Sequence, residues 1–355
     1  MLSKIAVSCA PHIGGPLSTR RIMADVIIAL VPAMLAGCLF FRGYALILIP
    51  TCIISSLVTE WLCNLLRRKE KPLESLGDFS AVITGIILAL SLPPAIPFWA
   101  AVIGSVFSVA IGKMVFGGLG CNIFNPAMAG RAFLTASFGM LMTTWTVPAT
   151  VDSTMPRLSP DAPNAITQAT PLGWSKQAIK NRQPHRNGFT STQHQDTSPG
   201  KAGFVNTQLK SLFVGSAAGC LGETSKIAVL LGGLYLLIRQ VINWRIPLAV
   251  LISTYICGTI GYAVDHSAYI SPLAHLATGG ILLGAFFIAT DPVTAPLTNK
   301  GAWVFGAGIG ALTILIRIVG EYPEGVMYAV LIMNAFTPLI DRFCKVLPAG
   351  GAPNV

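Results

Sequence analysis

Long runs of apolar residues dominate this chain of 355 residues. A helix that crosses a bilayer needs about 20 predominantly apolar residues. Ten runs reach or approach that length, and they cover residues 22–41, 44–66, 81–98, 99–116, 130–147, 224–238, 246–263, 276–290, 302–319 and 326–341. Only 11% of the residues are charged, whereas soluble domains carry roughly a quarter. The sequence therefore predicts an all-α polytopic membrane protein with about ten transmembrane helices, and it argues against an ordinary soluble enzyme.

The distribution of lysine and arginine predicts the orientation, because basic residues concentrate in short cytoplasmic loops. With a cytoplasmic N-terminus, fourteen of the 24 basic residues fall on the inner side: Lys4, Arg20, Arg21, Arg67, Arg68, Lys69, Lys71, Lys113, Arg131, Arg239, Arg245, Lys300, Arg342 and Lys345. The short outer turns then hold only Arg42 and Arg317. Both termini are therefore expected in the cytoplasm. The formal charge of +10 suits contact with anionic lipid, and we do not infer binding of nucleic acid.

The two halves of the chain share a sequence pattern. The matching pairs are NIFNP at 122–126 with NAFTP at 334–338, Thr84-Gly85 with Thr278-Gly279, and Lys113 with Arg317. Matches in the same order suggest a duplication, and an odd number of spans per half inverts the second copy. We expect two inverted five-helix repeats, at 22–147 and 211–345. They are joined by a polar outside loop at 148–210 and flanked by cytoplasmic segments at 1–21 and 346–355.

Proline and glycine interrupt several of the apolar runs. The predicted interruptions are Pro93-Pro94, GGLG at 117–120, Pro126, Gly219, Gly222 and Pro292. Inverted-repeat membrane proteins place their binding sites near the midplane, where helices are broken. Non-helical backbone at that depth is tolerated where it lines a cavity or is buried in protein. The alternative is that these residues only permit close crossings of helices.

Common soluble-enzyme motifs are missing from the sequence. It contains no P-loop, no Rossmann glycine motif, no H-E-x-x-H and no G-x-S-x-G. The eight cysteines form no C-x-x-C, so iron–sulfur or zinc ligation by this chain alone is not expected.

Three segments carry a resemblance to a known family: GGLGCNIFNPAMAGRAF at 117–133, NAITQATPLGW at 164–174 and GSAAGCLGETS at 215–225. From Arg20 to about Leu347 the chain resembles the RnfD family, whose members are membrane subunits of Rnf-type ferredoxin:NAD oxidoreductases. That family is related to the B subunit of the sodium-translocating NADH:quinone reductase. The resemblance implies a flavin-bearing component of a redox-driven Na⁺ or H⁺ pump in the bacterial inner membrane, which is not a complete enzyme alone.

The resemblance also implies two flavins. The family attaches FMN through a phosphoester to the threonine of an A-T-P-L segment, which here is Thr170. Asn164 stands where that motif often has an acidic residue. Without the resemblance, Thr170 would be interpreted as an ordinary loop residue.

Riboflavin is implied on the cytoplasmic side, near Asn122 and Asn125, with Asp291 as a weaker candidate. Two neutral amides can hydrogen-bond the polar edge of an isoalloxazine without burying a charge. The alternative role for both asparagines is to cap broken helix ends, where asparagine is favoured.

The expected partners follow from the same resemblance. They are the other members of the Rnf complex: a periplasmic FMN subunit, further membrane subunits, an NAD-binding subunit and a ferredoxin-accepting iron–sulfur subunit. A flavin transferase is expected for maturation. Electrons would pass from the outside flavoprotein to FMN on Thr170, then to riboflavin, and then toward the NAD-reducing subunit.

Ionisable residues inside membrane segments are functional candidates by default. Asp25, Glu60, Glu223 and Asp291 fall in this class. Asp25 and Glu60 are placed near cytoplasmic helix ends, where snorkelling or a helix-end role is expected. Glu223 follows a glycine-rich break and is the candidate for coupling to a cation.

Two other functions remain open at this stage. One is a solute channel or transporter built on the same inverted repeat, with 148–210 as a linker. The other is a component of a sodium-translocating NADH:quinone reductase, equivalent to its B subunit. Covalently bound flavin would distinguish the redox function from a transporter. The electron donor and acceptor would distinguish an Rnf-type complex from the quinone reductase.

Overall fold

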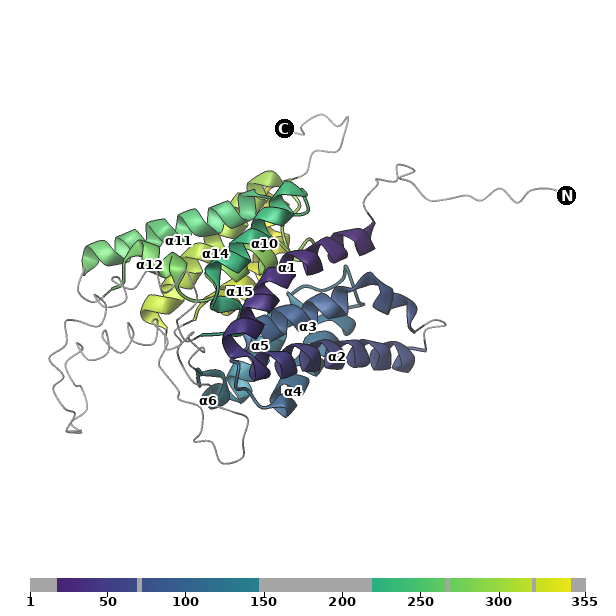
Figure 1. Cartoon of the computed structure of the whole chain (residues 1–355). Coiled ribbons are helices and arrows are strands. Elements are labelled where there is room, and N and C mark those ends of the chain that lie inside the picture. Colours follow the sequence, from purple (N-terminus) through teal and green to yellow (C-terminus); the bar gives the residue numbers. More distant parts are fainter. Residues whose placement is uncertain (1–17, 69–71, 147–218, 266–268, 321–323, 346–355) are drawn as a thin grey trace, which may run out of the picture.

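The computed structural model describes residues 18–68, 72–146, 219–265, 269–320 and 324–345, and these form a bundle of helices (Figure 1). The N-terminal group begins with α1 (Thr19–Phe41) and α2 (Gly43–Leu66), followed by the 3₁₀ turn η1 (Glu74–Asp78) and α3 (Ser80–Ser91). It ends with α4 (Phe98–Val109), the π-helical turn η2 (Ala110–Met114), α5 (Pro126–Ser137) and α6 (Gly139–Met142).

The C-terminal group repeats this all-helical character within the described residues. It opens with the 3₁₀ turn η3 (Leu221–Glu223), α10 (Lys226–Ile238) and α11 (Arg245–Val264). The remaining elements are α12 (Pro272–Ala277), α13 (Ile281–Leu283), the π-helical turn η4 (Gly284–Ile288), α14 (Asn299–Val319) and α15 (Val326–Phe343).

Five helices are long and apolar enough to cross a membrane, namely α1, α2, α11, α14 and α15. Three shorter apolar segments accompany them, formed by α3, by α4 with η2, and by α10. All ten predicted runs coincide at least in part with helical segments. The helical membrane class is thus supported, whereas ten crossings stay a prediction because half of the runs form short or divided helices.

Two of the expected helices show how the sequence interrupts them. α3 ends at Ser91, just before Pro93-Pro94, because proline cannot donate the next backbone hydrogen bond. The run at 276–290 contains a break between α12 and α13, at which Gly279 adopts a φ of 71° that favours glycine. The prolines were expected to interrupt the third run, and they do.

Buried cations satisfy the carbonyl groups that the second break leaves free. The guanidinium of Arg317 donates to the carbonyl oxygens of His275 at 2.8 Å and Thr278 at 2.9 Å. The ammonium of Lys226 donates to Gly279 O at 2.8 Å. The C-terminal end of a helix carries partial negative charge, so cations stabilise it. The break is therefore neutralised inside the protein.

The sequence pairs that suggested a duplication do not share local structure. NIFNP leads into α5, with Pro126 at the first helical position, whereas NAFTP at 334–338 lies inside α15. Thr84-Gly85 lies inside α3, and Thr278-Gly279 forms the break after α12. Inverted repeats therefore remain a prediction that these pairs alone do not support.

The two groups of helices pack directly against each other (Figure 1). Across the junction α1 packs on α10, α15 on α5, and η3 on both α1 and α3. Within the groups, glycines allow close approach: a Cβ atom at Gly85 would lie 2.8 Å from the backbone oxygen of Cys52 in α2. A Cβ at Gly310 would lie 2.6 Å from the backbone oxygen of Val250 in α11. Close packing of small residues is a typical way for membrane helices to associate.

Three basic residues used to infer the orientation are buried in the protein. Lys113, Arg131 and Arg317 are each less than one-tenth exposed, although the first two were counted on the cytoplasmic side and the third in an outer turn. Each of the three side chains has a polar partner inside the protein. They therefore carry no information about which side of the membrane faces the cytoplasm.

Candidate functional site

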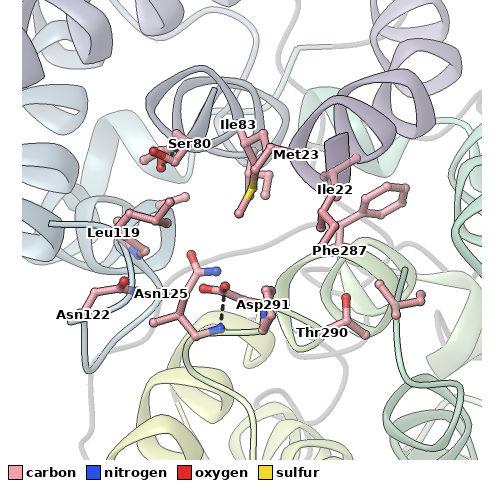
Figure 2. A pocket seen from close by; sticks show the side chains of 18 of the residues that line it. Ile22, Met23, Ser80, Ile83, Leu119, Asn122, Asn125, Phe287, Thr290 and Asp291 are labelled. Atoms are coloured by element: carbon pink, nitrogen blue, oxygen red, sulfur yellow. Dashed lines mark hydrogen bonds between the residues drawn. The ribbon is translucent and has the colours of Figure 1, made fainter. Parts of the chain in front are cut away.

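A pocket lies at the junction of the two helix groups and contains about 770 Å³ of empty space, part of which is open to the surroundings. From the N-terminal group it is lined by α1, α3, η2 and the segment before α5. From the C-terminal group it is lined by Leu236 of α10, by Phe286 and Phe287 of η4, and by residues 290–293. Both groups are needed to form it, as Figure 2 shows at close range.

The two asparagines of the predicted flavin site both line this pocket. Asn125 is the N-cap of α5, and its Oδ1 accepts a hydrogen bond from the backbone N–H of Met128 at 3.2 Å. Asn122 donates from Nδ2 to the backbone oxygen of Phe124 at 3.2 Å. The capping role is thus confirmed for Asn125. It leaves Asn125 Nδ2 as a donor and Asn122 Oδ1 as an acceptor without a partner among the described residues.

Glycines shape the turn that delivers Asn122 to the pocket. Gly117, Gly118 and Gly120 have φ values of 132°, 108° and 91°, which residues with a side chain rarely adopt. The segment can therefore turn sharply between η2 and α5, and it brings both Leu119 and Asn122 to the pocket wall.

Asp291 enters the same pocket from the C-terminal group. Its Oδ1 accepts from the backbone N–H of Val293 at 3.2 Å, and its Oδ2 accepts from the hydroxyl of Thr294 at 3.4 Å. In Figure 2 the side chains of Asn125 and Asp291 project into the same space from opposite groups of helices. The structure thus brings together the three residues that the sequence assigned to riboflavin.

Lys113 is a pocket residue that the sequence did not predict. It lies in η2, and its Nζ donates to Glu60 Oε2 at 2.8 Å and to Ser80 Oγ at 2.5 Å. Ser80 in turn donates from its hydroxyl to Asp78 Oδ1 at 2.5 Å. Glu60 is fully buried inside α2, so of its two expected roles, snorkelling to the membrane surface was wrong, whereas a role near the helix end stays a prediction. A glutamate inside the second apolar run and a lysine inside the fourth were the only signal for this pair.

The pocket suits a flavin by the chemistry of its lining. Apolar side chains such as Met23, Ile83 and Phe287 offer surfaces for the two faces of a flat ring system. The free donor of Asn125 and the free acceptor of Asn122 match the alternating acceptors and donors on the polar edge of an isoalloxazine. An apolar cavity with a few convergent polar groups is also typical of cofactor sites in general.

A second polar cluster ties the two groups of helices together farther along α5. The guanidinium of Arg131 forms an ion pair with Glu324, two residues before the start of α15, and contacts Cys220 Sγ at 3.3 Å. Glu223 accepts from the backbone N–H of Cys220 at 3.2 Å. The side-chain ligand atoms of Cys220, Glu223 and Glu324 lie within 4.8 Å of one another. Because Arg131 contacts Cys220 and Glu324, these two groups already have a cationic partner.

Asp25 is a third buried carboxylate with partners. It lies in α1 and accepts from the hydroxyl of Tyr235 at 3.0 Å and from Arg239 at 3.2 Å, both at the end of α10. This contact fixes α1 to α10 beside the pocket, because Met23, Val26 and Leu236 line the pocket wall. Asp25 thus has a structural role at the junction.

The predicted FMN attachment site lies outside the described residues. Thr170, Asn164 and the whole loop at 148–210 fall between the described residues Thr146 and Gly219. The phosphoester at Thr170 therefore stays a prediction.

Comparison with known proteins identifies relatives that the chain resembles over most of its length. Residues 6–350 match the family described as NQR2, RnfD, RnfE. The chain is 42% identical over 347 residues to the D subunit of the proton-translocating ferredoxin:NAD(+) oxidoreductase complex of Clostridium ljungdahlii, covering 97% of this chain and 96% of that protein.

Two further relatives are similarly close. The chain is 40% identical over 344 residues to the D subunit of the Na(+)-translocating ferredoxin:NAD(+) oxidoreductase complex of Acetobacterium woodii, covering 96% of this chain and 94% of the relative. It is 38% identical over 363 residues to the D subunit of the ion-translocating oxidoreductase complex of Cronobacter sakazakii, covering 96% and 97%. The chain therefore belongs to the NQR2, RnfD, RnfE family.

Proposed function

We propose that this chain is the RnfD component of an Rnf-type ferredoxin:NAD oxidoreductase, in which it carries flavin and relays electrons across the bacterial inner membrane. The observation that carries the proposal is identity of about 40% over nearly the whole length of relatives named as that component. The pocket between the helix groups supports the flavin role, because it joins apolar walls to two amides with unused hydrogen-bonding groups.

In this proposal the chain holds two flavins. FMN is attached to Thr170 on the outer side, and riboflavin occupies the pocket near Asn122, Asn125 and Asp291. The flavins supply the one-electron chemistry, and the protein supplies binding, orientation and electrostatics. The Asn125 amide would donate to the ring edge, the Asn122 carbonyl would accept from it, and the apolar walls would exclude water. Moving one charge across the membrane potential costs about 2.3 kcal/mol per 100 mV, which can couple electron transfer to ion movement.

The coupled ion is Na⁺ or H⁺. Relatives of nearly equal identity are named for proton translocation and for Na⁺ translocation, so overall similarity favours neither ion. Glu223 stays the coupling candidate of this proposal, since it is the carboxylate of the Arg131 cluster without a direct contact to that guanidinium.

The remaining parts of the proposal concern location and partners. Both termini lie in the cytoplasm, the loop at 148–210 lies outside, and the helices form two inverted repeats of five. The partners are the other members of the Rnf complex and a flavin transferase that modifies Thr170. A role in the related NADH:quinone reductase differs in electron donor and acceptor, and a solute transporter would carry no flavin.

Removal of both asparagine amides tests the pocket as the riboflavin site. We expect Asn122→Ala with Asn125→Ser to weaken riboflavin binding roughly thirtyfold, because two hydrogen bonds of about 1 kcal/mol each are lost. Serine at position 125 still caps α5, so the helix start is retained. Binding is measured by quenching of riboflavin fluorescence in a Thr170→Ala background, where covalent flavin does not contribute.

Asn299→Ala is the matched control, because Asn299 is exposed at the start of α14 and does not line the pocket. It is expected to bind riboflavin as the parent chain does. Equal affinity in the double variant and the parent would show that riboflavin, if bound, lies elsewhere.

A further inference from the structure

Lys113 is the one cationic side chain among the described residues that line the pocket. Its ammonium donates to the hydroxyl of Ser80, which also lines the pocket, and to the carboxylate of Glu60, 2.8 Å away. Glu60 does not line the pocket, so Lys113 is the member of this buried ion pair that belongs to the pocket wall. Both side chains are only 2% exposed, so water screens the pair little.

The local backbone holds Lys113 in this position. Lys113 lies in the wide turn η2, and such π-helical turns often occur at functional sites. A Cβ atom at the neighbouring Gly112 would lie 3.0 Å from the Cα of Pro126, so η2 packs tightly on the start of α5. The hydroxyl of Ser80, itself bonded to Asp78, fixes the ammonium from the side of α3.

A second source of positive potential points to the same place. The N-terminus of α5 enters the pocket wall through Asn125, Pro126 and Ala127. A helix N-terminus carries partial positive charge and favours a nearby anion. Asp291 is the one anionic side chain among the described lining residues, and it stands on the opposite group of helices. The pocket is thus polarised, with its positive side at Lys113 and α5.

We propose that Lys113 is the charge-compensating residue of this pocket, which makes the pocket bind reduced flavin more tightly than oxidised flavin. The inference rests on the proposed flavin site. A flavin held in this pocket would supply one-electron chemistry: one electron received from the proposed flavin on Thr170 would add one negative charge with no bond formed or broken, and that charge would leave with the electron when the next acceptor is reduced. Positive charge near the ring therefore raises the midpoint potential and favours electron entry.

Replacement of the whole ion pair provides the test, because a neutral pair of similar volume avoids leaving one charge buried alone. In Glu60→Gln with Lys113→Met, the preference of the pocket for reduced over oxidised riboflavin should fall at least tenfold. That change lowers the one-electron midpoint potential by about 59 mV. Lys113→Arg keeps the charge and should stay close to the parent. Midpoint potentials are measured by spectroelectrochemical titration of bound riboflavin in the Thr170→Ala background.

A second variant, for which the expected shift in midpoint potential has the opposite sign, provides the test if the double variant does not fold. Asp291→Asn removes the negative charge from the pocket and should raise the preference for reduced riboflavin by roughly threefold or more. A purely structural role for Lys113 predicts weaker binding of both redox forms with an unchanged midpoint, and that result in the double variant overturns the inference. If the double variant does not fold, an unchanged midpoint in Asp291→Asn overturns it. If the parent chain binds no riboflavin, the proposed flavin site fails and this inference fails with it.

Discussion

Replacement of Arg131 by methionine is expected to lower the free energy of unfolding by about 3–5 kcal/mol, which is the typical cost of breaking a buried ion pair. Arg131 lies in α5, and its partner Glu324 lies two residues before the start of α15, so the pair joins the two groups of helices. The side chains are 10% and 14% exposed. Methionine fills the space of the aliphatic stem but leaves the Glu324 carboxylate, with Cys220 beside it, buried without its cation.

The double variant Arg131→Met with Glu324→Gln separates the charge effect from packing. It removes both charges and should recover most of the lost stability, because neutral replacements of a buried pair are often tolerated. Thermal unfolding of the purified chain in detergent, followed by tryptophan fluorescence, provides the comparison. If the single and the double variant unfold at the same temperature, the ion pair is not what holds the junction together.

The second large effect is expected at Thr170, where replacement by alanine should abolish covalent flavin completely. A phosphoester needs the threonine hydroxyl, and alanine offers no oxygen to the flavin transferase. The chain is produced together with that transferase, separated by denaturing electrophoresis and viewed under ultraviolet light. The wild-type band should fluoresce and the Thr170→Ala band should be dark, with equal amounts of protein in the membrane fraction.

Thr167→Ala is the matched control, since Thr167 lies in the same NAITQATPLGW segment and also carries a hydroxyl. Its band should fluoresce like the wild type. A fluorescent Thr170→Ala band would place the covalent flavin on another residue. It would remove the reason for assigning the outer flavin to the loop at 148–210.

Local features of the fold were predictable from the sequence because they depend on neighbouring residues. Apolar runs of about 20 residues account for α1, α2, α11, α14 and α15. Pro93-Pro94 explains the end of α3, and the Asn125-Pro126 pair explains the start of α5 by capping. Caps, prolines and the length of an apolar run act within one helix, so they can be recognised directly in the sequence.

The polar contacts of the interior were not predictable in this way. Lys113 and Glu60 are 53 residues apart, and Arg131 and Glu324 are 193 residues apart. A rule that assigns basic residues to cytoplasmic loops has no means to recognise an arginine or lysine that is paired inside the bundle. Only the tertiary arrangement shows that these charges satisfy each other, and it also reveals Lys113 in the wall of the pocket.

The candidate flavin residues lie between these two cases. The resemblance to a family supplied Asn122 and Asn125, the predicted topology added Asp291, and the structure shows that all three line one pocket. The same resemblance supplied Thr170, which lies outside the described residues. The short sequence matches that suggested a repeat are not supported by local structure, because Asn122 precedes a helix whereas Asn334 lies within one.

In the proposed function, one chain holds a covalent flavin and a dissociable flavin. Acid denaturation of the purified wild-type chain, matured with its transferase, separates the two. We expect FMN bound to the peptide that contains Thr170, identified by mass spectrometry, and an equal amount of riboflavin released into solution. A protein pellet and a supernatant that both lack flavin would contradict the proposed function.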